Sequence, residues 1–431
     1  MSRIGAGVWP RNTDRPSGWA ASGDTAHALV VPRGPLRAYA EDLLAGPVSR
    51  RSLALAFSES AATSVEVLVE GESFYPRILE DIASASSSVH INQFGFKPGV
   101  VGDLFEDALV RKASEGVSVR LVVDSLGSAP DKGSRNLYRS LTAGGVEVCV
   151  VRATKPRAPF APLGSNGGIR WNLQGLGHVD HRKVVVVDGR VGWVGGAGIE
   201  DHFQDGRFHD LFVRVAGPVV AQLQLVFLAS FRWLGGGVPA EELDSVFPPL
   251  EAGESPIPAV VRHNAPGRYR PISSAISQLF EQSARTLDVV NPYVTDRRMI
   301  GRIIAAARRG VHVRLFVPAD ANNWACAAAQ RFHHAALLDA GVRIFEYPTM
   351  LHAKAFVRDG EELLVGTCNL EAWSLKRFFE IDLHVWSQGV AAQFDERFSA
   401  PAEAASVAGR PLTGLKERAK GTVFAALSPF L

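Results

Sequence analysis

Two short apolar segments of the chain each lead into an Asp-Gly pair. The first covers residues 184–187 and reads VVVV, and the second covers residues 355–357 and reads AFV. An Asp-Gly pair after a β-branched or apolar segment is a strong signal for a β-hairpin. Each segment therefore predicts a strand, a tight turn and a return strand.

Alternating strands and helices are predicted ahead of each hairpin. The segment GVxVRL occurs in both halves of the chain, at residues 116–121 and 310–315. Residues 65–96 are expected to form a strand, a turn, a helix and a second strand. We expect further helices at residues 101–115, 135–142, 272–284, 299–308 and 332–339, and further strands at residues 117–124, 146–151, 287–293 and 310–317. Residues 152–177 and 320–331 are expected to be loops. This alternation predicts an α/β sandwich in each half, and the shared order indicates an internal duplication.

The predicted elements divide the chain into an arm, two halves and a tail. Residues 1–60 are rich in Pro, Gly, Arg and Ser, and we expect a loosely ordered arm with a short helix at residues 35–44. Residues 61–250 form the first half, which carries the first hairpin. Residues 251–400 form the second half, and residues 401–431 form the tail.

The composition is that of an ordinary globular protein and argues against several classes. The chain has 431 residues, 46% of them hydrophobic, and its formal net charge of +2 gives no sign of a nucleic-acid partner. The cysteines Cys149, Cys326 and Cys368 lack CxxC spacing, which argues against a disulfide scaffold or a zinc finger and favours a reducing cytosol. We expect no membrane-spanning helix, since no apolar stretch of about 18 residues occurs, and no secretory signal.

Both predicted hairpins carry the polar motif HxKxxxxD. Its residues are His181, Lys183 and Asp188 in the first copy, and His352, Lys354 and Asp359 in the second. Side chains alternate along a strand, so the His and the Lys of each copy share one face, about 7 Å apart. An imidazole beside a permanent cation suits an anion such as a phosphate. The aspartates have the opposite parity and lie at the turn, where we expect them to brace the hairpin.

These residues resemble the HKD signature of the phospholipase D superfamily, HxKxxxxDx6G(S/T)xN. The second copy matches the whole signature and ends with Gly366, Thr367, Cys368 and Asn369, whereas the first copy has Gly198 in place of the final Asn. The resemblance and the duplication imply two phospholipase D-like α/β sandwich halves packed about a pseudo-twofold axis. Each half then presents one His and one Lys at the shared seam, where we expect the active site.

Cleavage of a phosphodiester needs a nucleophile, a general acid and fixed positive charge. As the superfamily implies, one histidine attacks phosphorus to give a phosphohistidine intermediate, and the other protonates the leaving group and then activates the acceptor. We predict His181 as the nucleophile and His352 as the acid and base, and the sequence alone leaves the reverse assignment open. Lys183, Lys354 and Asn369 are expected to hold the phosphate oxygens. No metal or other cofactor is expected, because the lysines neutralise the charge.

A catalytic histidine needs its second ring nitrogen oriented by an acceptor, usually a carboxylate. Asp210, in FHDLFVRV, and Glu380, in RFFEIDLHV, resemble the acidic residues that the superfamily places after its two motifs. We expect both to orient the histidines; the alternative is an ordinary charged residue at the start of a strand. A metal site is a competing interpretation of this region, and it would use His178, Asp180, His181 and His209.

The flanking segments resemble those of bacterial cardiolipin synthases, particularly members without transmembrane anchors. The resemblance lies in residues 67–76, in residues 181–201 and in the segment HDLFVRVAGPVV. It implies transfer of a phosphatidyl group from a phospholipid to an alcohol, either glycerol or a second phospholipid. With water as the acceptor, the same chemistry is phospholipase D hydrolysis. The sequence leaves two further functions open, namely a nuclease and a non-catalytic lipid-binding protein, the latter suggested by Gly198.

The C-terminal tail has apolar residues at helical spacing and basic residues elsewhere on the helical wheel. The apolar residues are Leu412, Leu415, Ala419, Val423, Ala426 and Leu427, and the basic residues are Lys416, Arg418 and Lys420. The pattern predicts an amphipathic helix, either at a membrane surface or packed on the body of the protein. We therefore expect a cytoplasmic protein bound peripherally to the inner face of the cell membrane, and we leave its oligomeric state open.

Overall fold

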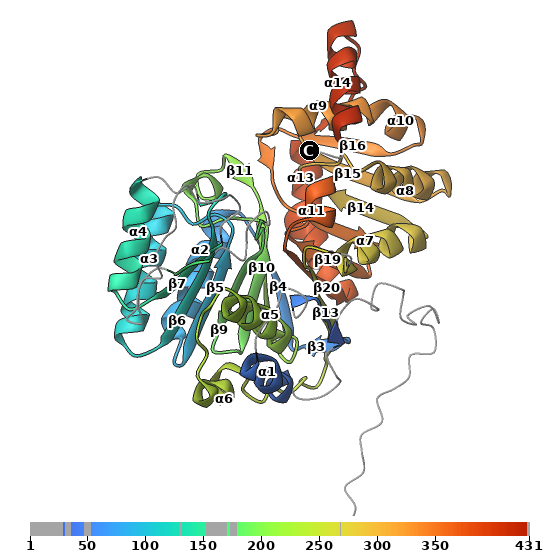
Figure 1. Cartoon of the computed structure of the whole chain (residues 1–431). Helices are drawn as coiled ribbons and strands as arrows, with labels where there is room; N and C mark the ends of the chain where they lie inside the picture. The colour runs from blue at the N-terminus through green and yellow to red at the C-terminus, as the bar shows by residue number, and fades with distance from the viewer. Residues whose placement is uncertain are drawn as a thin grey trace, which may run out of the picture.

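Two mixed β-sheets, one in each half of the chain, form the framework of the molecule (Figure 1). The computed structural model describes residues 29–30, 36–46, 53–128, 132–151, 170–172, 179–267 and 269–428. Helices pack against both sheets, which confirms the predicted α/β fold class. The loose order expected of the N-terminal arm concerns mainly residues 1–28, which lie outside the described residues.

The first sheet has eight strands, and its centre carries the first motif. In spatial order the strands are β4 (Ser64–Val69), β12 (Leu211–Ala216), β10 (Val191–Gly195), β9 (Lys183–Val187), β5 (Ser88–Gln93), β6 (Ser118–Asp124), β7 (Glu147–Val151) and β8 (Arg170–Asn172). Strands β5 to β8 are parallel neighbours, and the other neighbouring pairs are antiparallel. The helices that connect the strands are α2 (Gly71–Ser84), α3 (Val100–Ser114) and α4 (Lys132–Ala143).

The second sheet repeats this arrangement around the second motif. In spatial order its nine strands are β21 (Val407–Ala408), β16 (Arg343–Tyr347), β15 (His312–Pro318), β14 (Thr286–Val290), β18 (Ala355–Arg358), β19 (Glu362–Gly366), β20 (Glu380–Trp386), β13 (Ile257–Asn264) and β3 (Ser60–Ala62). Its helices are α7 (Pro271–Gln282), α8 (Arg297–Arg308), α9 (Trp324–Phe332), α10 (His334–Asp339), α11 (Ala372–Lys376), α12 (Gln388–Phe394), η6 (Asp395–Ser399), α13 (Ala400–Ala405) and α14 (Leu415–Leu427). The order from β13 to β16 matches the order from β4 to β7, so the internal duplication is visible in the topology.

Both expected loops contain regular structure where they are described. Of residues 152–177, residues 170–172 form strand β8, and the others lie outside the described residues. The interpretation of residues 320–331 as a loop is wrong, because α9 begins at Trp324. The side chain of Asn323 accepts hydrogen bonds from the backbone N–H groups of Ala325 and Cys326, both at 3.2 Å. This cap and the alanine-rich segment behind it favour a helix.

The two motif hairpins form at equivalent places in the sheets. The turn between β9 and β10 has φ angles of 51° at Asp188 and 60° at Gly189, and the turn between β18 and β19 has 55° at Asp359 and 67° at Gly360. Asp tolerates this left-handed region and Gly favours it, which explains the Asp-Gly pair. Lys183 pairs with the last residue of β5. The motif side chains therefore lie where the parallel strands end, and we call this side of the sheets the carboxyl edge.

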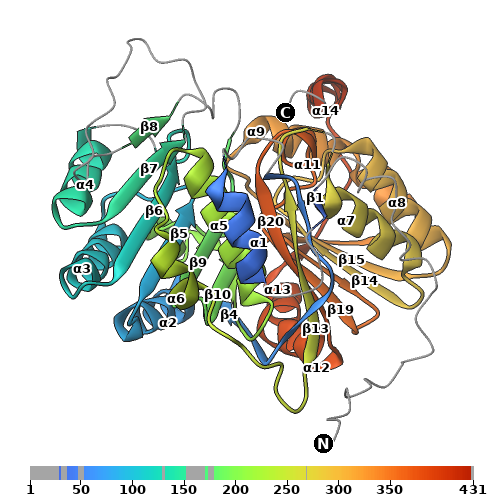
Figure 2. The ribbon, with the colours of Figure 1, turned by 60° about the horizontal axis from the view of Figure 1, so that its bottom comes forward.

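The halves share one hydrophobic core. Helix α5 (Val220–Trp233) is buried along most of its length and contacts strands of both sheets, and α1 (Leu36–Ala45) packs on it (Figure 2). The shared core includes Leu223 and Val226 of α5 with Leu363 and Ile381 of the second sheet. Burial of a side chain of this size contributes about 1.5–3 kcal/mol. In addition, β3 precedes β4 in the sequence but pairs with β13 in the second sheet.

Short elements complete the fold. They are β1 (Leu29–Val30), β2 (Leu55–Ala56), η4 (Asp201–Phe203), β11 (Phe208–His209), η5 (Ala240–Glu242), α6 (Leu243–Val246) and β17 (Met350–Leu351). The helix expected at residues 35–44 is present as α1. Among the helices of the described residues, none has the length and apolar character needed to cross a membrane.

Candidate active site

Each motif begins with a backbone hydrogen bond to the other half of the molecule. The N–H of His352 donates to the carbonyl oxygen of His209 at 2.8 Å, next to the parallel pairing of β11 with β17. Similarly, the N–H of His181 donates to the carbonyl oxygen of Phe379 at 3.0 Å, next to the bridge between Asp180 and Phe379. These reciprocal contacts bring the two motifs to one seam, which the fold prediction anticipated.

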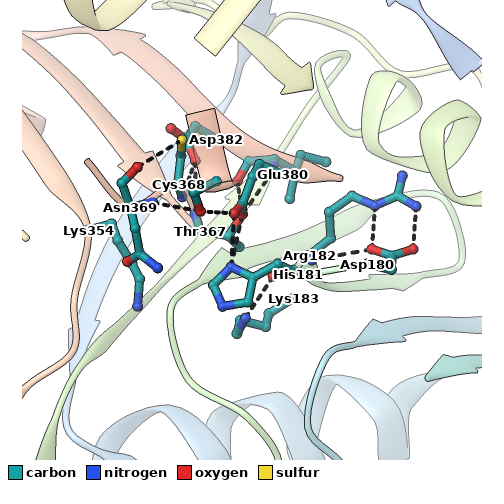
Figure 3. Close-up of polar contacts among 12 residues, drawn as sticks. Asp180, His181, Arg182, Lys183, Lys354, Thr367, Cys368, Asn369, Glu380 and Asp382 are labelled. Atoms are coloured by element: carbon teal, nitrogen blue, oxygen red, sulfur yellow. Dashed lines mark hydrogen bonds and ion pairs between the residues drawn. The ribbon is translucent and has the colours of Figure 1, made fainter. Parts of the chain in front are cut away.

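Each motif histidine is bonded to a carboxylate from the opposite half. Nδ1 of His181 lies 3.0 and 3.1 Å from the carboxylate oxygens of Glu380, as Figure 3 shows. Nδ1 of His352 lies 2.7 Å from Oδ2 of Asp210. A carboxylate at Nδ1 fixes the ring and the tautomer that leaves Nε2 free to react. Glu380 and Asp210 thus lie where orienting groups are needed. The sequence did not show that each histidine takes its carboxylate from the other half.

Two buried lysines complete the group. Lys183 and Lys354 are each 1% exposed. Nζ of Lys183 donates to the carbonyl oxygen of His181 at 2.7 Å and lies 4.8 Å from the ring centre of Phe94. Nζ of Lys354 lies 3.0 and 3.1 Å from Nδ1 and Nε2 of His352, and it also donates to the carbonyl oxygen of that residue. Two ammonium groups beside two imidazoles form a site that suits an anion.

Burial sets the charges of these four groups. It lowers the pKa of Lys183 to about 8 and the pKa of Lys354 to about 7. Burial and the neighbouring lysines lower the pKa of His352 to about 3 and hold the pKa of His181 well below its usual value. Both imidazoles are therefore neutral near pH 7. An anion bound between the lysines would raise their pKa values again, because opposite charges favour each other's ionised forms.

The two orienting carboxylates have different surroundings. Burial raises the pKa of Glu380 to about 8, although Oγ1 of Thr367 donates to it at 2.5 Å and the hydroxyl of Ser374 also donates to it. Burial also opposes ionisation of Asp210, but its hydrogen bond with His352 and the charge of Lys354 outweigh that effect and lower its pKa. The negative charge is thus held more firmly at Asp210 than at Glu380.

Asn369, the last residue of the complete signature, has a free polar atom in the site. It is 5% exposed, and its Oδ1 has no hydrogen-bond partner among the described residues. Its backbone N–H donates to the hydroxyl of Ser374 at 3.2 Å, which fixes the loop, and Figure 3 shows its side chain together with that of Lys354. Buried polar groups usually have partners, so Oδ1 can accept a hydrogen bond from a ligand, whereas contact with a phosphate oxygen needs the Nδ2–H of the amide, which donates.

The motif aspartates lie at the opposite ends of the hairpins from the motif histidines. The carboxylate of Asp188 accepts hydrogen bonds from the backbone N–H groups of three residues just before and at the start of β5, all at 2.8 Å. Asp359 accepts equivalent bonds just before and at the start of β14, at 2.7 to 3.2 Å. Burial opposes ionisation, but these bonds outweigh it and lower both pKa values. Each aspartate therefore ties its hairpin to the neighbouring strand.

Aromatic rings enclose the histidines, and the sequence analysis did not single them out. The ring centre of His352 lies 5.5 Å from that of Phe203 and 5.7 Å from that of Phe208. The ring centre of Phe94 lies 4.8 Å from that of His181. These rings exclude water and so contribute to the burial that shifts the pKa values. Phe94 directly follows β5, Phe203 ends η4 and Phe208 begins β11, and no motif in the sequence pointed to these rings.

The residues of the alternative metal site point to other partners. Oδ1 of Asp180 accepts a hydrogen bond from Nε of Arg182 at 2.8 Å, and Nδ1 of His209 is paired with Glu70. His178 lies outside the described residues. Within the described residues, no three His, Cys, Asp or Glu side chains are grouped as metal ligands.

Comparison with known proteins finds relatives that cover most of the chain. The family model described as "Cardiolipin synthase, PLD-like domain" matches residues 78–228 and 276–401. A cardiolipin synthase of Geobacillus thermodenitrificans (strain NG80-2) is 29% identical over 339 residues, which are 76% of this chain and 64% of that protein. A cardiolipin synthase of Geobacillus sp. (strain WCH70) is 27% identical over 396 residues, which are 86% of this chain and 73% of that protein. The chain thus spans slightly less than two thirds of the length of the first of these relatives.

Solved structures share the fold. The phosphatidylserine synthase of Haemophilus influenzae Rd KW20 has a TM-score of 0.65 and 13% identity, and the match covers 92% of this chain and 100% of that one. A polyphosphate kinase of Porphyromonas gingivalis has a TM-score of 0.53 and 11% identity, and the match covers 85% of this chain and 53% of that one. At such identities the likeness concerns the fold alone. The family model, however, covers more than half of the chain and includes both motifs, and the chain therefore belongs to the cardiolipin synthase, phospholipase D-like domain family.

Proposed function

We propose that this protein transfers phosphatidyl groups between alcohols through a phosphohistidine intermediate, as a cardiolipin synthase would. The observation that carries the proposal is the crossed pair of histidine–carboxylate contacts beside two buried lysines. The family membership and the names of the relatives support it. The proposed substrate is a phospholipid, whose head group is joined through a phosphodiester.

In the first step, His181 is the nucleophile. Its Nδ1–H donates to Glu380, which leaves the lone pair of Nε2 for attack on phosphorus. The anionic phosphodiester raises the pKa of His352 when it binds, so that the ring takes up a proton from solvent at Nε2. The P–N bond then forms while the P–O bond to the head-group alcohol breaks, and the leaving alkoxide takes that proton. Asp210 suits the support of this acid, since its charge is held firmly and stabilises the imidazolium that precedes proton transfer.

In the second step, an acceptor hydroxyl replaces the histidine. Nε2 of His352 takes the proton of the hydroxyl, and the hydroxyl oxygen attacks phosphorus while the P–N bond breaks. Lys183, Lys354 and Asn369 hold the non-bridging oxygens in both steps. With phosphatidylglycerol as donor and acceptor, the products are cardiolipin and glycerol. With water as acceptor, the product is phosphatidic acid.

Exposed apolar side chains near the carboxyl edge support contact with a lipid surface. Val100 follows the carboxyl end of β5, Leu126 follows that of β6, and Trp324 follows that of β15. Their exposed fractions are 70%, 57% and 58%. Scattered apolar residues are normal on a surface, but these lie on the side of the sheets that carries the motif histidines. A phospholipid could therefore enter the site from a bilayer that this edge contacts.

Helix α14 adds basic charge to this surface. It packs on α9, where a side chain on Gly421 would meet Phe332, and it leaves Leu415 and Val423 exposed. Nζ of Lys420 lies 4.8 Å from the ring centre of Trp324. The tail was predicted either to contact a membrane or to pack on the body of the protein. The two roles are compatible, because one side of α14 packs on the protein and the other is exposed. We propose peripheral binding to an anionic membrane face through α9 and α14.

Vesicle sedimentation tests this surface. The double variant Leu415→Glu, Val423→Glu should bind phosphatidylglycerol-containing vesicles severalfold more weakly than wild type. His312→Glu, at the start of β15 on the opposite side of the sheet, adds charge as a control and should bind normally. Equal binding of all three proteins would contradict the assignment of this surface.

Product analysis tests the proposed function. Purified protein is incubated with phosphatidylglycerol vesicles, with and without glycerol, and the lipids are measured by mass spectrometry. Cardiolipin formed by wild type, but not by His181→Ala or His352→Ala, is the expected result. Phosphatidic acid alone would assign hydrolysis instead, and no lipid turnover at all would contradict the proposal.

A further inference from the structure

The two motif copies differ where the signature ends. The second copy has Asn369 and, two residues later, Glu371. The first copy has Gly198 and, two residues later, Glu200. Both copies therefore have a glutamate two residues after the last position of the signature. That position carries an amide side chain in the second copy and no side chain in the first.

The two glutamates make different contacts. Glu371 caps helix α11, and its carboxylate accepts hydrogen bonds from the backbone N–H groups of Trp373 and Ser374 at 2.6 and 2.7 Å. Glu200 precedes η4 and makes no such cap bond. Its carboxylate instead lies in the space that a side chain at Gly198 would need, because a Cβ there would be 2.6 Å from Oε1 of Glu200. Glu200 thus occupies, in the first half, the place that corresponds to the Asn369 side chain in the second.

Glu200 is buried beside a cation. It is 8% exposed, and its Oε2 lies 2.6 Å from Nζ of Lys97. Burial is the largest influence on Lys183 and lowers its pKa, while Glu380, Asp210 and Glu200 oppose that shift with their charges. The carboxylate of Glu200 is therefore close enough to Lys183 to act on it electrostatically.

The exchange of an amide for a carboxylate changes what this position can bind. An amide N–H can donate to a phosphate oxygen, whereas an ionised carboxylate only accepts hydrogen bonds and repels a phosphate. A hydroxyl group is the donor that a phosphatidyl-transfer site receives in its second step. We propose that Glu200, held by Lys97, binds a hydroxyl group of a polyol acceptor and so selects alcohol over water. This inference rests on the proposed function and names the acceptor side of the same site.

Acceptor kinetics test the inference. With phosphatidylglycerol as donor and isotope-labelled glycerol as acceptor, transfer is measured as the label that enters the lipid. In Glu200→Gln, the glycerol concentration that gives half-maximal labelling should rise about tenfold or more, as expected for a lost hydrogen bond to a charged group. Phosphatidic acid release without glycerol should stay within about twofold of wild type, because that step needs no polyol. Asp201→Asn is the matched control: Asp201 caps α3 through the N–H of Val101 at 2.9 Å, so its loss should lower thermal stability and leave the glycerol dependence unchanged.

Two further variants guard against a folding defect. Lys97→Gln removes the partner of Glu200 at a half-exposed side chain and should raise the half-maximal glycerol concentration by a smaller factor. Gly198→Asn combined with Glu200→Gly puts an amide where the first copy has the carboxylate and should retain hydrolysis while losing the preference for alcohol.

The outcomes separate this inference from the proposed function. An unchanged glycerol dependence in Glu200→Gln, or a parallel loss of transfer and hydrolysis, would overturn the role of Glu200 while the phosphohistidine chemistry stands. If the wild-type protein only hydrolyses phospholipids and transfers nothing to glycerol, the role of Glu200 in selecting alcohol is also overturned. Only the absence of all lipid turnover would overturn both.

Discussion

In the second half, the carboxylate of Glu380 receives hydrogen bonds from the hydroxyls of Thr367 and Ser374, whereas in the first half Asp210 receives one from a backbone N–H at 2.7 Å. Gly196 stands in the first copy where Thr367 stands in the second, and a Cβ at Gly196 would lie 2.7 Å from Oδ2 of Asp210. The strand order of the halves is thus repeated, but the groups around the two carboxylates are not. The duplicated backbone carries two different histidine environments.

This difference assigns different tasks to the two histidines in our proposal. Asp210 shares its charge with few other donors and faces His352, which suits an acid that must become an imidazolium. Glu380, whose pKa burial raises to about 8, accepts hydrogen bonds from two hydroxyls and faces His181, which suits a histidine that must stay neutral to attack.

Loss of either motif histidine should have the largest effect. His181→Ala and His352→Ala should each lower lipid turnover by roughly 10³-fold or more, since one removes the nucleophile and the other the acid and base. Initial rates of head-group release measure this. His312→Ala, at an exposed histidine outside the site, should keep the wild-type rate; a comparable loss there would point to a folding defect.

Loss of an orienting carboxylate should have the next largest effect, and an unequal one. Asp210→Asn and Glu380→Gln should each lower the single-turnover rate by roughly 10- to 100-fold, with the larger loss in Asp210→Asn. Glu362→Gln is the control, because Glu362 is a buried carboxylate bonded to His384 outside the site. Equal losses of rate in Asp210→Asn and Glu380→Gln would contradict the assignment of different tasks to His352 and His181.

Removal of the signature amide should have a smaller effect. Asn369→Gly makes the second copy like the first at this position and should lower kcat/KM about tenfold, the value expected for one hydrogen bond to an anionic phosphate. The thermal midpoint should change little, since Oδ1 of Asn369 has no partner among the described residues. A loss of stability that accounts for the lost activity would contradict a role in binding.

The smallest difference between the halves should appear in the pH dependence of the variants at Lys354 and Lys183. The pKa of Lys354 is about 7 and that of Lys183 is about 8, so both lysines lose charge as the pH rises through this range. Because an uncharged lysine binds a phosphate poorly, kcat/KM should fall on the alkaline side by up to about tenfold per pH unit. Lys354→Arg should move this fall to higher pH and Lys183→Arg should move it less. A flat profile above pH 7 in wild type would contradict the lowered pKa values.

The sequence predicted the parts of the site that depend on local pattern. The Asp-Gly turn placed Asp188 at the other end of the hairpin from the motif histidine. Strand parity does not apply to the His–Lys pairs as predicted, because β9 begins at Lys183 and β18 at Ala355, so that both motif histidines precede the strands. The repeated order of elements predicted the two halves and their seam.

The crossed pairing could not be read from the sequence, because it joins residues far apart in the chain. His181 and Glu380 are 199 positions apart, and His352 and Asp210 are 142 positions apart. Helix α9 was missed because its cap, Asn323, follows a segment that looks irregular. Glu200 was missed because its position depends on the absence of a side chain at Gly198, which only the packing shows.

The central claim is that His181 forms the phosphohistidine intermediate, and trapping of that intermediate tests it most directly. Wild type, His352→Ala and His181→Ala are mixed briefly with phosphatidylglycerol, quenched with base to preserve phosphohistidine, digested and analysed by mass spectrometry. We predict a phosphatidyl group on His181 in wild type, with more of it in His352→Ala when an activated donor with a good leaving group is used, and none in His181→Ala. A phosphatidyl group on His352, or turnover without any adduct in wild type and both variants, would contradict the account.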